Sequence, residues 1–155
     1  MLDLEKNLAR VLLILSAICL IVMTAVISWQ VFTRYLLGSS PPWAEPAALL
    51  LLIWFVLFAA SAGVYECSHI EVGFFRDGML ARWSSALHRI SDLLVAMFGI
   101  AMIYGGWMLI DVTRKHTIPG LGVTRAVAYW PLVFSGFAIA FFSLVKIYNR
   151  QLRKG

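Results

Sequence analysis

The sequence predicts an all-α integral membrane protein that crosses the bilayer four times. Of its 155 residues, 61% are hydrophobic and only 14% are charged, whereas about a quarter of the residues in a soluble domain are charged. The apolar residues collect in four uncharged blocks, each close to the ~20 residues that span a hydrocarbon core about 30 Å thick. None of these blocks alternates between polar and apolar residues, as the strands of a membrane barrel do.

We expect one four-helix membrane domain over residues 1–155, with transmembrane helices at residues 11–32, 46–65, 92–111 and 127–146. The first block is longer than the apolar core of a signal peptide, and no small-residue cleavage site follows it. It is therefore expected to remain as the first helix.

Turn-forming residues separate the blocks within each half of the chain. Residues 38–42 read Gly-Ser-Ser-Pro-Pro, which predicts a tight turn and makes the first two helices antiparallel neighbours. Gly120 and Gly122 predict a second turn before the fourth helix. Pro131 falls within the first two turns of that helix, where proline is tolerated or produces a kink.

Basic residues predict the orientation of the helices. Nine of the 13 Lys and Arg residues lie on the two tails and in the loop between helices two and three, and the other four lie on the opposite side. This bias places both termini in the cytoplasm. The net charge of +5 thus orients the helices, and we expect no nucleic-acid partner.

The loop between helices two and three contains an amphipathic segment over residues 74–90. Leu80, Trp83, Leu87 and Ile90 recur at helical spacing, and two arginines fall off that stripe. Such a helix either lies in the cytoplasmic membrane surface or packs on the ends of the other helices. The pattern does not choose between these two arrangements.

Tryptophans indicate depth in the membrane. Trp43, Trp107 and Trp130 fall at the outer helix ends, as an interfacial aromatic belt requires. Trp54 falls near the middle of the second helix, where its indole N–H needs an acceptor. We therefore expect Trp54 to face protein. The small-residue run from Ala59 to Gly63, which begins five residues after Trp54, would let another helix approach closely.

Charged residues cluster at the ends of the apolar blocks. Arg34 and Glu45 flank the first turn, where they either pair across the hairpin or fix helix depth as separate charges. Asp92 is expected at the start of the third helix, where the helix dipole favours an acid. Asp111 lies at the end of that helix, and we expect it to pair with Arg114 or with a partner chain.

Three stretches resemble the small membrane subunit of tripartite ATP-independent periplasmic (TRAP) transporters, the DctQ-like family. The first is RYLLGSSPPWAEP, in which these positions match: Arg34, Tyr35, Pro42, Trp43, Glu45 and, beyond it, Trp54. A second glutamate is usual in this motif, and Pro46 replaces it.

The other two stretches follow helices two and three. In SHIEVGFF the matching positions are His69, Ile70 and Val72, while Gly73 replaces the usual acid. The third stretch is IPGLGV followed by AYWPL, in which the matching positions are Gly122 and Pro131. The resemblance covers nearly the whole chain.

The resemblance implies a multi-pass protein of the bacterial inner membrane that is not an enzyme. Its partners would be a large elevator-type membrane subunit (the M subunit), a periplasmic substrate-binding protein (the P subunit) and membrane lipids. The small subunit would brace the large one during sodium-coupled uptake of organic acids. It would hold no cofactor itself, and the sodium ions would bind in the large subunit. The structural or subunit-interface candidates are Arg34, Trp43, Glu45, Trp54, Gly63, His69, Gly122 and Pro131.

The uncharged helix interiors agree with this expectation, because a carrier of ions needs polar or ionisable groups near the bilayer midplane. The alternative is a small four-helix carrier or electron-transfer protein that acts alone. A haem carrier requires histidines within facing helices, and all three histidines fall outside the four apolar blocks, so we expect them in the loops. His69 with Glu66 and Glu71 could also be read as a metal site, but a polar cap or a partner contact is the stronger reading.

Overall fold

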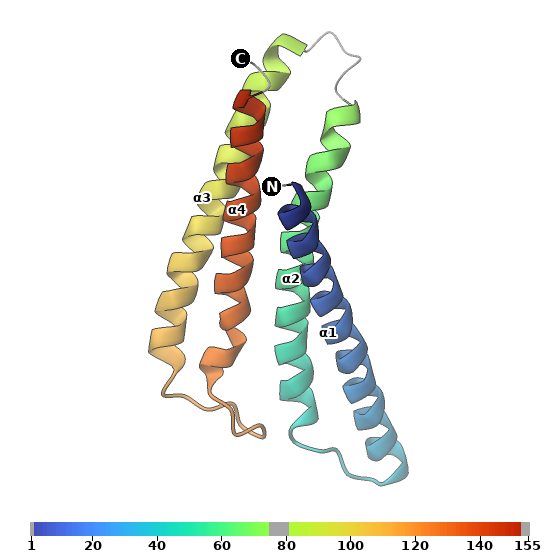
Figure 1. The fold of residues 1–155 in the computed structure, drawn as a ribbon. Coiled ribbons are helices and arrows are strands. Elements are labelled where there is room, and N and C mark those ends of the chain that lie inside the picture. Colours follow the sequence, from blue (N-terminus) through green and yellow to red (C-terminus); the bar gives the residue numbers. More distant parts are fainter. Residues whose placement is uncertain (1, 75–80, 153–155) are drawn as a thin grey trace.

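The computed structural model describes the backbone of residues 2–74 and 81–152, and side chains over residues 5–66 and 90–147. It contains the helices α1 (Leu2–Leu36), α2 (Ala44–Phe74), α3 (Ala81–Thr113) and α4 (Trp130–Leu152), with a short 3-10 helix η1 (Arg125–Ala128) before α4 (Figure 1). All four α-helices are long and apolar enough to cross a membrane. The predicted all-α class with four membrane-spanning helices is confirmed.

The helices extend beyond the predicted apolar blocks. Helix α1 has 35 residues, which corresponds to a length of about 52 Å at 1.5 Å per residue. No proline or glycine interrupts residues 2–36, so the helix continues past its charged ends. It ends at Leu36, two residues before Gly38, whose φ of +66° is the left-handed conformation that follows the end of many helices.

The amphipathic segment over residues 74–90 does not form a separate surface helix in the described part of the chain. Residues 81–90 are helical, but they form the first turns of α3 and continue unbroken to Thr113. No proline or glycine lies between Ala81 and Ile90, so nothing stops the helix there. Residues 75–80 lie outside the described residues.

Helix α4 begins three residues later than predicted because of Pro131. Proline lacks the N–H that would continue the hydrogen-bond pattern of a preceding helix, but it fits the first turn of a new one. Residues 125–128 accordingly form η1, and α4 starts at Trp130. Pro131 is fully buried.

The helices form an open row rather than a closed bundle. Helix α1 packs on α2, α2 packs on α4, and α4 packs on α3 (Figure 1). Both chain termini lie toward one end of the row, called here the terminal end, and the two short loops lie at the opposite, loop end. The predicted antiparallel pairing of helices one and two is confirmed. Within the described residues, α1 and α3 stand at opposite edges.

Two glycines set the distance between α3 and α4. A Cβ atom added at Gly99 would lie 2.9 Å from the backbone oxygen of Gly136, and one added at Gly136 would lie 2.8 Å from the backbone oxygen of Gly99. These backbones therefore approach too closely for any side chain between them. Small residues have the same role in many membrane helix pairs.

Two side-chain hydrogen bonds join α2 to the second hairpin. The Ser135 hydroxyl donates to the Leu57 carbonyl oxygen at 2.8 Å, and the Trp54 indole N–H donates to the Val127 carbonyl oxygen at 3.2 Å. We call this contact the α2–α4 seam. Toward the terminal end, a buried cluster continues it with residues from α1, α2 and α4: Ala9, Leu12, Phe58, Ala62, Ala138 and Phe142.

The two loops touch at the loop end. A Cβ atom added at Gly120 would lie 2.6 Å from the Pro42 carbonyl oxygen, and the φ of Gly120 is +84°. Gly122 also has a positive φ, of +67°, and the turn is closed by a bond from the Ile118 N–H to the Val123 carbonyl oxygen at 2.8 Å. The predicted turn is confirmed.

Replacing Gly136 with alanine is expected to destabilise the α3–α4 hairpin by about 1–3 kcal/mol, the usual cost of overpacking. The free energy of unfolding in mixed detergent micelles measures this effect. The matched control is Gly105→Ala, because a Cβ at Gly105 meets no atom within 4 Å. Equal losses in the two variants would contradict the close approach.

Removing the Ser135 hydroxyl with Ser135→Ala is expected to weaken the seam by about 0.6–2 kcal/mol, as for other hydrogen bonds between membrane helices. The control is Ser16→Ala, because buried Ser16 donates only within its own helix, to the Leu13 carbonyl oxygen. Unfolding free energies of the two variants should differ, with the larger loss at Ser135. The reverse order would argue against the seam.

Candidate functional site

The first candidate residues lie at the loop end, between α1 and α2. Arg34 is in the last turn of α1 and Glu45 is in the first turn of α2. Both side chains are exposed, and both line a groove of about 410 Å³ between the two helices. The charged atoms of Arg34 and Glu45 are not within 4.0 Å of each other, so the described residues show no ion pair between these two side chains. The hairpin brings the charges together without pairing them.

The two candidate tryptophans face different surroundings. Trp43 lies just before α2 at the loop end and is 39% exposed, in agreement with a place in an interfacial belt. Trp54 is half-buried, makes an edge-to-face contact with Phe58 and donates to Val127 of η1. The acceptor expected for its indole N–H therefore comes from this chain.

The small-residue run in α2 serves two surfaces. Ser61 and Ala62 are fully buried, and Ala62 belongs to the core cluster shared with α4. Gly63 lies on a different side of α2 that is not packed against the described residues, because a Cβ atom added there meets none of their atoms within 4 Å. Its neighbour Ala60, one turn away, is exposed. This side of α2 is therefore both small and uncovered by the rest of the described chain.

The remaining sequence-derived candidates have structural positions in the fold. Gly122 lies in the turn between α3 and η1, and Pro131 is the second residue of α4. His69 falls in the last part of α2, but its side chain lies outside the described residues. The suggested grouping of His69 with Glu66 and Glu71 falls partly outside them as well. Over the part that is described, no group of three or more possible ligands gathers to hold a metal ion.

An ion pair near the terminal end was not predicted. The Lys146 Nζ atom of α4 lies 2.9 Å from the Asp92 Oδ1 atom of α3, and the Asp92 side chain is only 7% exposed. Helix α3 begins at Ala81, so Asp92 lies about three turns inside it, and the expected role at a helix start is wrong. The sequence did contain a signal for this pair. Asp92 directly precedes the third apolar block and Lys146 directly follows the fourth, so antiparallel helices place both residues at the same membrane depth.

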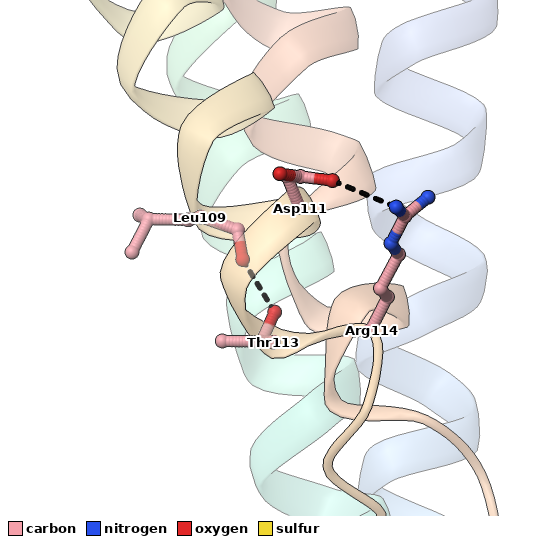
Figure 2. A network of polar contacts seen from close by, with 4 residues as sticks. All are labelled: Leu109, Asp111, Thr113 and Arg114. Atoms are coloured by element: carbon pink, nitrogen blue, oxygen red, sulfur yellow. Dashed lines mark hydrogen bonds and ion pairs between the residues drawn. The ribbon is translucent and has the colours of Figure 1, made fainter.

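A second ion pair lies at the loop end of α3. The Arg114 Nη2 atom is 3.2 Å from the Asp111 Oδ1 atom, and the Thr113 hydroxyl donates to the Leu109 carbonyl oxygen at 2.5 Å (Figure 2). The expected pairing of Asp111 with Arg114 is confirmed. Both charged side chains are 66% exposed, so the pair contributes little to stability.

Comparisons with known proteins agree with this architecture. Residues 23–153 match the family described as tripartite ATP-independent periplasmic transporters, DctQ component. A sialic acid TRAP transporter small permease protein, SiaQ, of Vibrio cholerae is 28% identical over 129 residues, covering 82% of this chain and 73% of the relative. A putative TRAP transporter small permease protein of Haemophilus influenzae is 21% identical over 152 residues, covering 96% of this chain and 92% of the relative.

A second putative small permease protein of Haemophilus influenzae is 21% identical over 131 residues, covering 84% of this chain and 81% of the relative. Together with the four apolar helices, these relatives indicate a multi-pass protein of the bacterial inner membrane. The chain belongs to the DctQ component family, the small permease subunits of TRAP transporters.

Proposed function

We propose that this subunit braces a large elevator-type membrane subunit during sodium-coupled uptake that depends on a periplasmic binding protein. In this role it moves no solute and catalyses no reaction. The observation that carries the proposal is the combination of an open row of helices with four apolar stretches, residues 11–33, 47–65, 93–110 and 128–145, that contain no acidic or basic side chain.

The distribution of charge supports a scaffold rather than a pathway. Asp92 and Lys146 pair with each other near the terminal end, and Asp111 pairs with Arg114 at the loop end. A carrier of ions or organic anions needs ionisable groups near the midplane. The sodium sites of the transporter would therefore lie in the large subunit.

The open row supports a partner on its surface. Among the described residues, α1 packs mainly on α2 and α3 mainly on α4, and large apolar side chains are exposed along both outer helices. Such a layer can lie against the stationary part of a larger membrane protein and widen its footprint. A closed bundle of the same size would offer less surface.

The substrate class is proposed to be organic acids. The name of the Vibrio cholerae relative refers to sialic acid, which is an organic acid, and this supports the class for the transporter that the chain serves. The choice of substrate within the class would belong to the binding protein and the large subunit.

Within α2, the side that carries Ala60 and Gly63 is proposed to contact the large subunit. It combines small residues with open space, which favours close approach of another helix. Trp54, by contrast, uses its indole N–H within the chain.

Purification with a large partner tests the bracing role. The tagged chain, solubilised in mild detergent from cells that express the transporter genes, is expected to retain a large subunit of roughly a dozen helices. Reconstituted alone in vesicles, it should give no sodium-driven uptake of organic acids; with its large subunit and binding protein, uptake should appear. Uptake by the chain alone would overturn the proposal.

The contact surface is tested by Gly63→Leu, with Gly105→Leu as the control. An added Cβ at either glycine meets no atom of the described residues within 4 Å, so both variants should fold. Large exposed Met108 and Leu109 surround Gly105, so that site does not favour close approach. We expect Gly63→Leu to lower recovery of the large subunit about tenfold, equivalent to 1.4 kcal/mol, while Gly105→Leu leaves recovery unchanged. Normal recovery with Gly63→Leu would exclude this surface.

A further inference from the structure

The groove between α1 and α2 has charged residues at one end and apolar residues along the rest of its length. Arg34 and Glu45 line it at the loop end, and Gln30 follows one turn further in. Deeper still, its walls are apolar and include Ile27, Met23 and Leu52. This order of polarity is that of a phospholipid, with a charged headgroup above two hydrocarbon chains.

The length of the groove corresponds to one leaflet of a bilayer. On α1 it is lined by Met23, Ile27, Gln30 and Arg34, whose spacing of three and four residues places them on one helix face. Arg34 lies eleven positions after Met23, which gives a rise of about 16 Å at 1.5 Å per residue. A hydrocarbon core about 30 Å thick has leaflets of about half that thickness.

The two charges at the mouth fit a zwitterionic headgroup. The Arg34 guanidinium can bind a phosphate through two parallel hydrogen bonds, and the Glu45 carboxylate can accept hydrogen bonds from a primary ammonium. Both side chains are exposed in the same groove, and they form no ion pair with each other. A headgroup that carries both charges would satisfy the two residues together.

We propose that the α1–α2 groove binds a zwitterionic aminophospholipid, with its phosphate on Arg34, its primary ammonium on Glu45 and an acyl chain along the apolar walls. This inference goes beyond the bracing role and does not depend on it. In this arrangement Arg34 and Glu45 share one ligand and do not need to form an ion pair with each other.

Native mass spectrometry of the full-length chain tests the proposal. The chain, in mild detergent, is mixed with equal amounts of phospholipids that share their acyl chains and carry ethanolamine, choline or glycerol headgroups. Ethanolamine lipid is expected to be retained about tenfold more than either of the others, the effect of one charge-assisted hydrogen-bonded contact. Choline lacks N–H donors and glycerol lacks the positive charge, so equal retention of all three would overturn the proposal.

Two variants test separately which residue binds the phosphate of the headgroup and which binds its ammonium group. Arg34→Gln is expected to lower retention of all three lipids about tenfold, whereas Glu45→Gln should keep binding but abolish the preference for ethanolamine. The control is Arg125→Gln, because Arg125 lines a separate groove on the other side of Glu45, and it should behave as the unchanged chain. Equal behaviour of Arg34→Gln and Arg125→Gln would refute the phosphate contact.

Size-exclusion profiles show whether each variant folds, and if Arg34→Gln does not, Glu45→Gln tests the headgroup preference independently. The same measurement on the chain purified with its large subunit distinguishes lipid from protein in the groove. Retained ethanolamine lipid supports the proposal, and its loss on assembly would show that the groove is a protein interface instead.

Discussion

The seam between α2 and α4 is the contact on which the rest of the fold depends, because it joins two helical hairpins that otherwise stand side by side. In a bilayer the hydrophobic effect does not press helices together, so packing and hydrogen bonds must do so. Here the donors are Trp54 and Ser135, and their acceptors are backbone carbonyl oxygens of Val127 and Leu57. The irregular η1 turn before α4 matters for this reason, since it presents one of the two acceptors.

The seam also explains why the outer helices remain free for other contacts. With α2 and α4 in the middle of the row, α1 and α3 lie at the edges, and in the described part of the chain each packs mainly on one α-helix. Two contacts hold the second hairpin itself: the ion pair of Asp92 with Lys146 and the close packing of Gly99 against Gly136. Neither draws the row into a closed bundle. The subunit is thereby a thin layer, which suits a protein that works beside a larger one.

Residue patterns predicted the number and type of the helices well, because apolar length is a strong signal in membrane proteins. They also located the turn glycines, the pairing of Asp111 with Arg114, and the need of Trp54 for an acceptor. Helix ends were predicted less accurately, because the absence of proline and glycine lets α1 and α3 run on beyond their apolar blocks. The Asp92–Lys146 pair and the Gly99–Gly136 contact depend on which faces of two helices meet, and a single sequence does not specify that. Whether the eight candidate residues take part in subunit contacts stays a prediction.

The uncharged stretch of α1 is longer than the hydrocarbon core of the membrane is thick. Twenty-three residues separate Arg10 from Arg34, which corresponds to about 35 Å of helix against a hydrocarbon core of about 30 Å. Such hydrophobic mismatch is relieved by tilting, and in Figure 1 α1 is inclined to α2, so that the two helices spread apart toward the loop end. The angle between the helices, and with it the width of the space between them, is thus coupled to bilayer thickness. A thinner bilayer favours a wider opening.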